Sequence, residues 1–102
     1  SDAIDEGEAQ KQFKPVEVYE FLFKDAVVYA QKAAADELCG QFYNSCEFYS
    51  RSMELMTFLI EEGSGVPLDP PLKLPEHEKL KLSQLIAKMK ERKDKCTPTA
   101  SI

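Results

Sequence analysis

The chain has 102 residues, 43% of them apolar and 30% charged, with a net charge of −5 at pH 7. A chain of this size predicts one domain with one modest core. No stretch approaches the ~20 apolar residues that a membrane span needs, so no transmembrane helix is expected. Residues 1–72 hold five Lys or Arg and fourteen Asp or Glu, whereas residues 73–102 hold eight and four. The acidic body argues against a nucleic-acid-binding protein, and the basic end favours an acidic partner.

Both ends of the chain lack an apolar pattern. Residues 1–14 are polar and acidic, and residues 97–102 are short and unpatterned, so we expect flexible tails around a domain at 15–96. The three cysteines are Cys39, Cys46 and Cys96. The first two are seven residues apart in a helical pattern, which is too far for a disulfide. Reduced thiols in a cytoplasmic protein are therefore expected.

The first predicted helix covers residues 16–39. Pro15 suits its first turn, and neither glycine nor another proline interrupts it before Gly40. One apolar stripe recurs at spacings of three and four: Val18, Leu22, Ala26, Tyr29 and Ala33. Gly40 ends this helix, because glycine adopts the left-handed cap conformation without steric cost.

The second predicted helix covers residues 41–62 and has two apolar stripes. The first is Phe42, Cys46, Tyr49, Met53, Met56 and Ile60, and the second is Ser45, Phe48, Ser52, Leu55 and Leu59. A helix that is apolar on two sides is covered on two sides, so this helix is expected at the centre of the domain. Ser45 and Ser52 are small enough to let a neighbouring backbone approach closely.

A proline-rich linker and a third helix follow. Residues 66–75 read VPLDPPLKLP, and their four prolines favour an extended path. The third predicted helix covers residues 76–96, with one apolar stripe and lysines elsewhere, so it is expected at the periphery. The short turn at Gly40 makes the first two helices antiparallel, and the long linker lets the third return beside them. The sequence predicts an all-α, antiparallel up-down-up three-helix bundle.

Signals of catalysis are absent from the sequence. The single histidine, His77, lies at a helix start between two glutamates, and a solvated histidine is the expected interpretation. No serine sits in a nucleophile-elbow context, and the glycines form no phosphate loop. The cysteines and His77 lack zinc-site spacing. We therefore expect no catalytic, metal or cofactor-binding residue, and a domain that is not itself an enzyme.

Residues 26–59, AVVYAQKAAADELCGQFYNSCEFYSRSMELMTFL, resemble the first two helices of MIT (microtubule interacting and trafficking) domains. The residues that carry the resemblance are Ala26, Ala33, Gly40, Phe42, Ser45, Cys46 and Tyr49. Tetratricopeptide hairpins share some of this pattern, but no repeat follows here. Two departures are a longer, proline-rich second linker and a strongly basic third helix.

The resemblance implies a docking domain of a larger trafficking protein that binds C-terminal tails of ESCRT-III proteins. One type of ligand is an arginine-bearing helix between the second and third helices. The other is an extended, proline-bearing strand between the first and third helices. On this basis the domain is expected to be monomeric and recruited by its partners to endosomal or autophagic membranes. The predicted groove residues are Tyr49, Met53, Met56, Leu82, Leu85, Met89 and Arg92.

Two other functions remain open. Residues 18–41 also resemble the last MIT-like repeat of ULK-type autophagy-initiating kinases, through the shared Ala-Val, Gln, Ala-Ala and Asp-Glu positions between Ala26 and Glu37. That resemblance implies a scaffold domain that binds a regulatory partner subunit. A plain oligomerisation bundle is the third possibility. The VPLDPPLKLP segment is either a linker or a segment that lies across its own domain and competes with partners.

Overall fold

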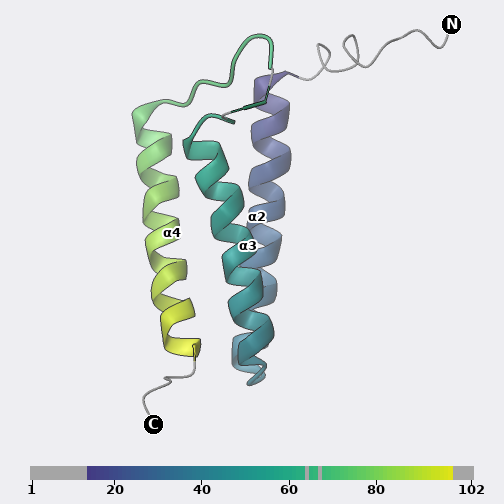
Figure 1. The fold of residues 1–102 in the computed structure, drawn as a ribbon, viewed down its shortest axis with the longest axis vertical. Coiled ribbons are helices and arrows are strands. Elements are labelled where there is room, and N and C mark those ends of the chain that lie inside the picture. The colour runs from purple at the N-terminus through teal and green to yellow at the C-terminus, as the bar shows by residue number, and fades with distance from the viewer. Residues whose placement is uncertain (1–13, 64, 67, 98–102) are drawn as a thin grey trace, which may run out of the picture.

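Three long helices make up the regular structure of the computed structural model, which describes residues 14–63, 65–66 and 68–97. Helix α2 spans Pro15–Leu38, α3 spans Phe42–Ile60 and α4 spans Glu76–Cys96, and the described residues form no strand. Successive helices run antiparallel, with α3 in the middle (Figure 1). The protein is thus an all-α three-helix bundle, as the sequence predicts. Apart from Lys14 and Thr97, the tails predicted at 1–14 and 97–102 lie outside the described residues.

A tight turn joins α2 to α3. The backbone N–H of Gln41 donates to the Asp36 carbonyl at 2.8 Å, and that of Gly40 donates to the Glu37 carbonyl at 3.1 Å. These two bonds form a Schellman motif, which needs a left-handed residue just after the helix. Gly40 supplies it with a φ of 78°. The chain therefore reverses at once, and α3 begins at Phe42 alongside the end of α2.

Small residues bring α2 and α3 close together at two levels. Ala26, Ala33, Ser45 and Ser52 are all 0% exposed. The Ser45 hydroxyl donates to the Ala33 carbonyl at 2.8 Å, and the Ser52 hydroxyl donates to the Ala26 carbonyl at 2.6 Å. Each buried hydroxyl is thereby satisfied, as a buried polar group must be. The close approach predicted for the two serines is present in the structure.

The other side of α3 receives α4. Leu82, Met89 and Cys96, which are spaced by seven residues, are the buried side chains of α4. Leu82 and Met89 join Tyr49 and Met56 of α3 in the core cluster. Helix α4 packs along α3 rather than along α2, which leaves it at the edge of the bundle. The central position of α3 and the peripheral position of α4 follow the stripes seen in the sequence.

Residues 68–74, which we call the strap, close one end of the bundle. Leu72 is only 4% exposed and belongs to the core, and Leu68 and Leu74 pack against that core. The backbone N–H of Leu74 donates to the Glu62 carboxylate at 2.9 Å, and Lys79 of α4 lies 3.3 Å from the same carboxylate. The strap therefore lies across its own domain, and its competition with partners stays a prediction.

Helix α3 ends two residues before the predicted position, at Ile60. The backbone reverses through two successive left-handed residues, Glu62 at a φ of 57° and Gly63 at 66°. The N–H of Glu62 donates to the Leu59 carbonyl, and that of Gly63 donates to the Phe58 carbonyl, which caps the helix. This turn aims the Glu62 side chain at the strap.

Candidate docking surfaces

The seven residues predicted to line one groove occupy different parts of the molecule. Four lie in the core with at most 7% of their surface exposed: Tyr49, Met56, Leu82 and Met89. Met53 is half-buried and lies on α3, whereas half-buried Leu85 and exposed Arg92 share the flank of α4 that faces α2. The structure therefore does not bring the seven together on one open surface.

Arg92 takes part in a contact that joins all three helices. The Glu37 carboxylate of α2 accepts a hydrogen bond from the Tyr49 hydroxyl of α3 at 3.0 Å and another from Arg92 Nε of α4 at 3.2 Å. A second guanidinium nitrogen of Arg92 also contacts this carboxylate. Burial raises the pKa of Tyr49, which favours the protonated, donating form of its hydroxyl. The arrangement commits Arg92 to holding the bundle together.

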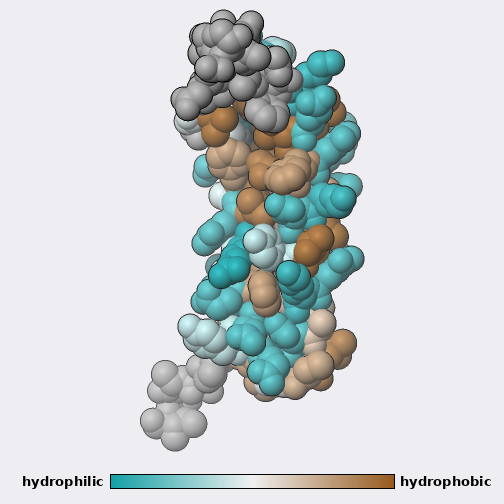
Figure 2. All heavy atoms as spheres, turned by 90° about the vertical axis from the view of Figure 1, so that its right-hand side faces the viewer, coloured by the Kyte–Doolittle hydropathy of each residue, from teal (hydrophilic) through white to brown (hydrophobic). Residues whose placement is uncertain are grey.

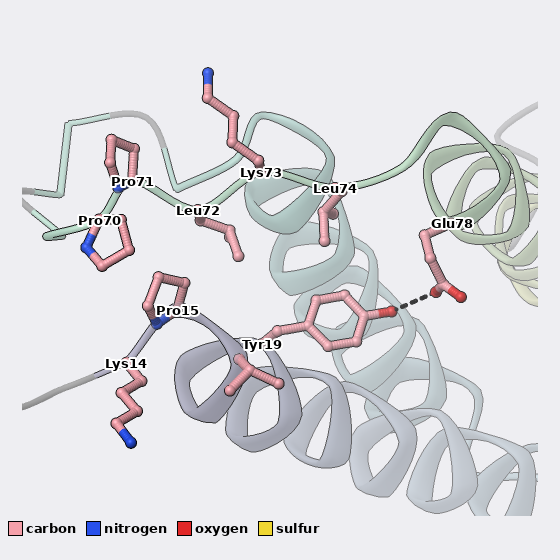
Figure 3. Close-up of a pocket in the computed structure, with 10 residues that line it drawn as sticks. Lys14, Pro15, Tyr19, Pro70, Pro71, Leu72, Lys73, Leu74 and Glu78 are labelled. Carbon is pink, nitrogen blue, oxygen red and sulfur yellow. Dashed lines mark hydrogen bonds between the residues drawn. The ribbon is translucent and has the colours of Figure 1, made fainter.

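A hollow on the surface lies where α2 begins and the strap crosses. This end hollow encloses about 720 Å³. Figure 3 shows its wall of carbon atoms, with the strap on one side and the first turns of α2 on the other. Its lining residues are Lys14, Pro15, Val16, Tyr19, Pro70, Pro71, Leu72, Lys73, Leu74 and Glu78. An apolar recess with a few polar groups is typical of a binding site.

Two carboxylates are engaged in and beside the end hollow, that of Glu78 in its lining and that of Glu62 next to the strap. The Tyr19 hydroxyl donates to the Glu78 carboxylate at 2.9 Å across its α4 side. Burial and this hydrogen bond raise the pKa of Tyr19 to about 12. The N–H of Leu74 holds the pKa of the Glu62 carboxyl below its usual value, with smaller contributions from the nearby lysines. Both carboxylates are therefore engaged with the bundle and the strap rather than with solvent alone.

The second hollow lies on the outer face of α3. This α3 hollow encloses about 480 Å³ and is lined by Ser50, Met53, Glu54, Thr57, Phe58, Glu61 and Lys93. The short side chains of Ser50 and Thr57 lower the surface between bulkier neighbours. Met53 is the one predicted groove residue that it contains. Lys93 is the contribution of α4, so the hollow adjoins the junction of α3 with α4.

A row of carboxylates runs along the same face of α3. Glu47, Glu54 and Glu61 are spaced by seven residues and are all exposed. Seven residues are nearly two helical turns, about 10.5 Å, so the three side chains lie on one face. Within the described part of the chain, none of them has a cation within 4 Å. The seven-residue spacing was readable in the sequence, and the sequence interpretation missed it.

The described residues contain no cluster of three metal-ligating side chains. The His77 ring, whose side chain is 78% exposed, lies 3.7 Å from Glu78. None of the helices that the structure describes is both long and apolar enough to cross a membrane. The two hollows and the carboxylate row offer contact area and charge on the surface of the bundle.

No protein-family model, no curated protein and no solved structure matches the chain. The likeness to MIT domains stays a prediction made from the residues that carry it.

Proposed function

We propose that this bundle is a protein-docking domain, and that it holds a basic, amphipathic helix of a partner protein on the outer face of α3. The observation that carries the proposal is the row of Glu47, Glu54 and Glu61 beside the α3 hollow, which makes no ion pair with any other described residue. Exposed carboxylates without internal partners are free to meet cations of a ligand. The hollow between the last two of them gives an apolar side chain a place to rest.

The geometry suits a helical ligand better than an extended one. The carboxylates repeat every two turns, so a helix lying along α3 presents Lys or Arg at the same interval. Met53 and Phe58 flank the space where the apolar face of that helix rests. Lys93 closes the α4 side of the hollow and repels a ligand cation placed there, which fixes the side from which the ligand's cations approach.

ESCRT-III C-terminal tails are the partners that the likeness to MIT domains implies, and the arginine-bearing helical type fits this face. The basic side chains of α4 repel the arginines of such a ligand. The carboxylate row on α3 supplies the acidic surface that such a ligand needs. We propose accordingly that the domain belongs to a larger trafficking protein and that partner tails bring it to endosomal or autophagic membranes.

The end hollow supports a second type of ligand. Its prolines and aliphatic side chains suit an extended segment that carries a proline or leucine, with the tyrosine ring of Tyr19 as part of the wall. Such a segment corresponds to the extended ligand expected between the first and third helices. It also suits a regulatory subunit that holds an autophagy kinase scaffold, which is the alternative function.

A titration of the ¹⁵N-labelled chain with a panel of ESCRT-III C-terminal peptides tests the proposal. We expect the amide shifts of α3 residues to change and to reach saturation, with dissociation constants of about 10–500 μM for a small interface. Glu54→Gln combined with Glu61→Gln should weaken binding about tenfold, since two exposed charge pairs are lost. Glu20→Gln removes a carboxylate on α2, away from the proposed site, and should leave the affinity for the peptides unchanged. If no peptide of the panel binds with a dissociation constant below ~1 mM, the proposal is wrong.

A further inference from the structure

Two cations and two aromatic rings meet on the face of the α2–α3 hairpin that lies away from α4. The rings of Tyr29 and Phe48 stack with centroids 6.0 Å apart and planes 21° from parallel. The Arg51 guanidinium lies 5.9 Å from the first centroid and 5.7 Å from the second. Lys32 Nζ lies 5.6 Å from the Phe48 centroid. We call these four residues the cation–aromatic patch.

The helical period places the patch opposite the junction with α4. The Cys46 thiol contacts the Lys93 carbonyl of α4, so that side of α3 is covered. Phe48 lies two residues further on and therefore about 200° around the helix, on the uncovered side. The patch is thus separate from the end hollow, and it adjoins the carboxylate row only along the edge of α3.

Among the residues that the structure describes, neither cation of the patch is used in an ion pair. Residues 15–60 contain three Lys or Arg and seven Asp or Glu, so carboxylates are plentiful around them. Asp36 follows Lys32 by four residues and Glu47 precedes Arg51 by four, so both carboxylates are within reach along a helix, and the second pair has the more favourable order. Within the described residues, neither pair comes within 4 Å. Both side chains lie over the rings instead, with their charged heads exposed.

Apolar surface continues from the patch along α2. Val28 is 38% exposed and Phe21 is 65% exposed, and both lie on the stripe of α2 that includes Lys32. Figure 2 views the molecule from the α2 side and shows apolar side chains set among hydrophilic ones along this face. The surface thus offers two fixed cations beside a flat aromatic platform and an apolar extension.

We propose that this cation–aromatic patch is a second docking surface, for an acidic segment of a partner protein that carries an apolar residue between its carboxylates. One carboxylate pairs with Lys32 and another with the fork of Arg51, which suits bidentate binding. The apolar side chain between them rests on the Tyr29 and Phe48 rings. The two cations are held by the rings before the ligand arrives, so little side-chain freedom is lost on binding. This inference does not depend on the function proposed for α3.

The test uses the labelled chain and two capped peptides, Glu-Leu-Phe-Glu and its uncharged counterpart Gln-Leu-Phe-Gln. Saturable amide shifts centred on Lys32, Phe48 and Arg51 are expected with the first peptide and not with the second. Lys32→Gln combined with Arg51→Gln should weaken the interaction about fivefold or more, and raised salt should do the same. Lys88→Gln, an equal charge change on exposed α4, should leave it unchanged.

Three results would overturn this proposal. Equal shifts with both peptides would show that charge has no part in binding. Shifts spread over the lysines of α4 would show unspecific attraction to the basic helix. If phosphatidylserine vesicles retain the chain through Lys32 and Arg51 while the acidic peptide causes no shift, the patch is a membrane contact and not a protein-docking surface.

Discussion

At the scale of single residues, the α2–α3 contact depends on four small side chains that larger ones cannot replace. They are Ala26, Ala33, Ser45 and Ser52. Ser52 is fully buried and its hydroxyl donates to the Ala26 carbonyl at 2.6 Å. That carbonyl lies within a helix, so the serine adds a second hydrogen bond to it. Any larger side chain at this position pushes α2 away from α3, because close-packed interiors have no spare volume.

A pair of substitutions at Ser52 separates the two contributions. Ser52→Ala removes only the hydroxyl and should lower the free energy of unfolding by about 1 kcal/mol. Ser52→Leu also overpacks the contact and should lower it by about 2–3 kcal/mol or more. Urea unfolding followed by circular dichroism measures both. Ser83→Leu on the exposed side of α4 is the control, and equal stability of both leucine variants would show that the helices are not in close contact at Ser52.

At the scale of elements, the strap is a structural part of the bundle rather than a simple linker. Its core side chain, Leu72, is 4% exposed, whereas the next residue, Lys73, points to solvent. The alternation follows from the extended path that the prolines impose. The Glu62 carboxylate fixes the strap at one side through the N–H of Leu74 and ties it to Lys79 of α4.

Truncation of the buried strap residue should therefore be costly. Leu72→Ala is expected to lower the free energy of unfolding by about 2 kcal/mol or more and to expose the strap to proteases. Lys73→Ala, its solvent-facing neighbour, should stay within about 0.5 kcal/mol of the parent chain. Chemical unfolding and limited proteolysis measure the two effects. Equal values for both variants would mean that the strap does not support the core.

Prediction from sequence succeeded for the elements and was weaker for the surface. The 3.6-residue stripes and Gly40 located the helices and the central position of α3, because periodicity states which sides of a helix are apolar. The period does not indicate how deeply each apolar side chain is buried. Leu82 and Met89 were therefore predicted to line a groove, although they lie in the core. The pairing of Glu37 with Arg92 joins residues 55 positions apart, and no local pattern reveals it.

At the scale of the whole molecule, α4 is held chiefly by one neighbour. It packs on α3, and its links to α2 include hydrogen bonds of Glu78 with Tyr19 near one end and of Arg92 with Glu37 near the other. The α2–α3 hairpin has the more extensive interface. Regions with fewer packed contacts open at lower free energy, so α4 should open before the hairpin does.

Native-state hydrogen exchange tests this order of opening. Amides of α4 should exchange through a partial opening that leaves those of α2 protected. Arg92→Gln removes the three-helix contact and should speed exchange in α4 about three- to tenfold, with little change around Ala26. Lys90→Gln removes a charge from the same helix without that contact and should have no such effect. Uniform acceleration in all three helices would contradict the separate opening of α4.

The four small residues between α2 and α3 also have a use in finding relatives. Ala26 and Ala33 are separated by six residues, as are Ser45 and Ser52, and eleven residues lie between the two pairs. Other residues can be replaced as long as the apolar stripes are kept. At these four positions the short distance between the α2 and α3 backbones limits the size of the side chain. A search for small residues at these intervals, with a glycine between the pairs at the position of Gly40, would detect distant homologues whose overall identity has decayed.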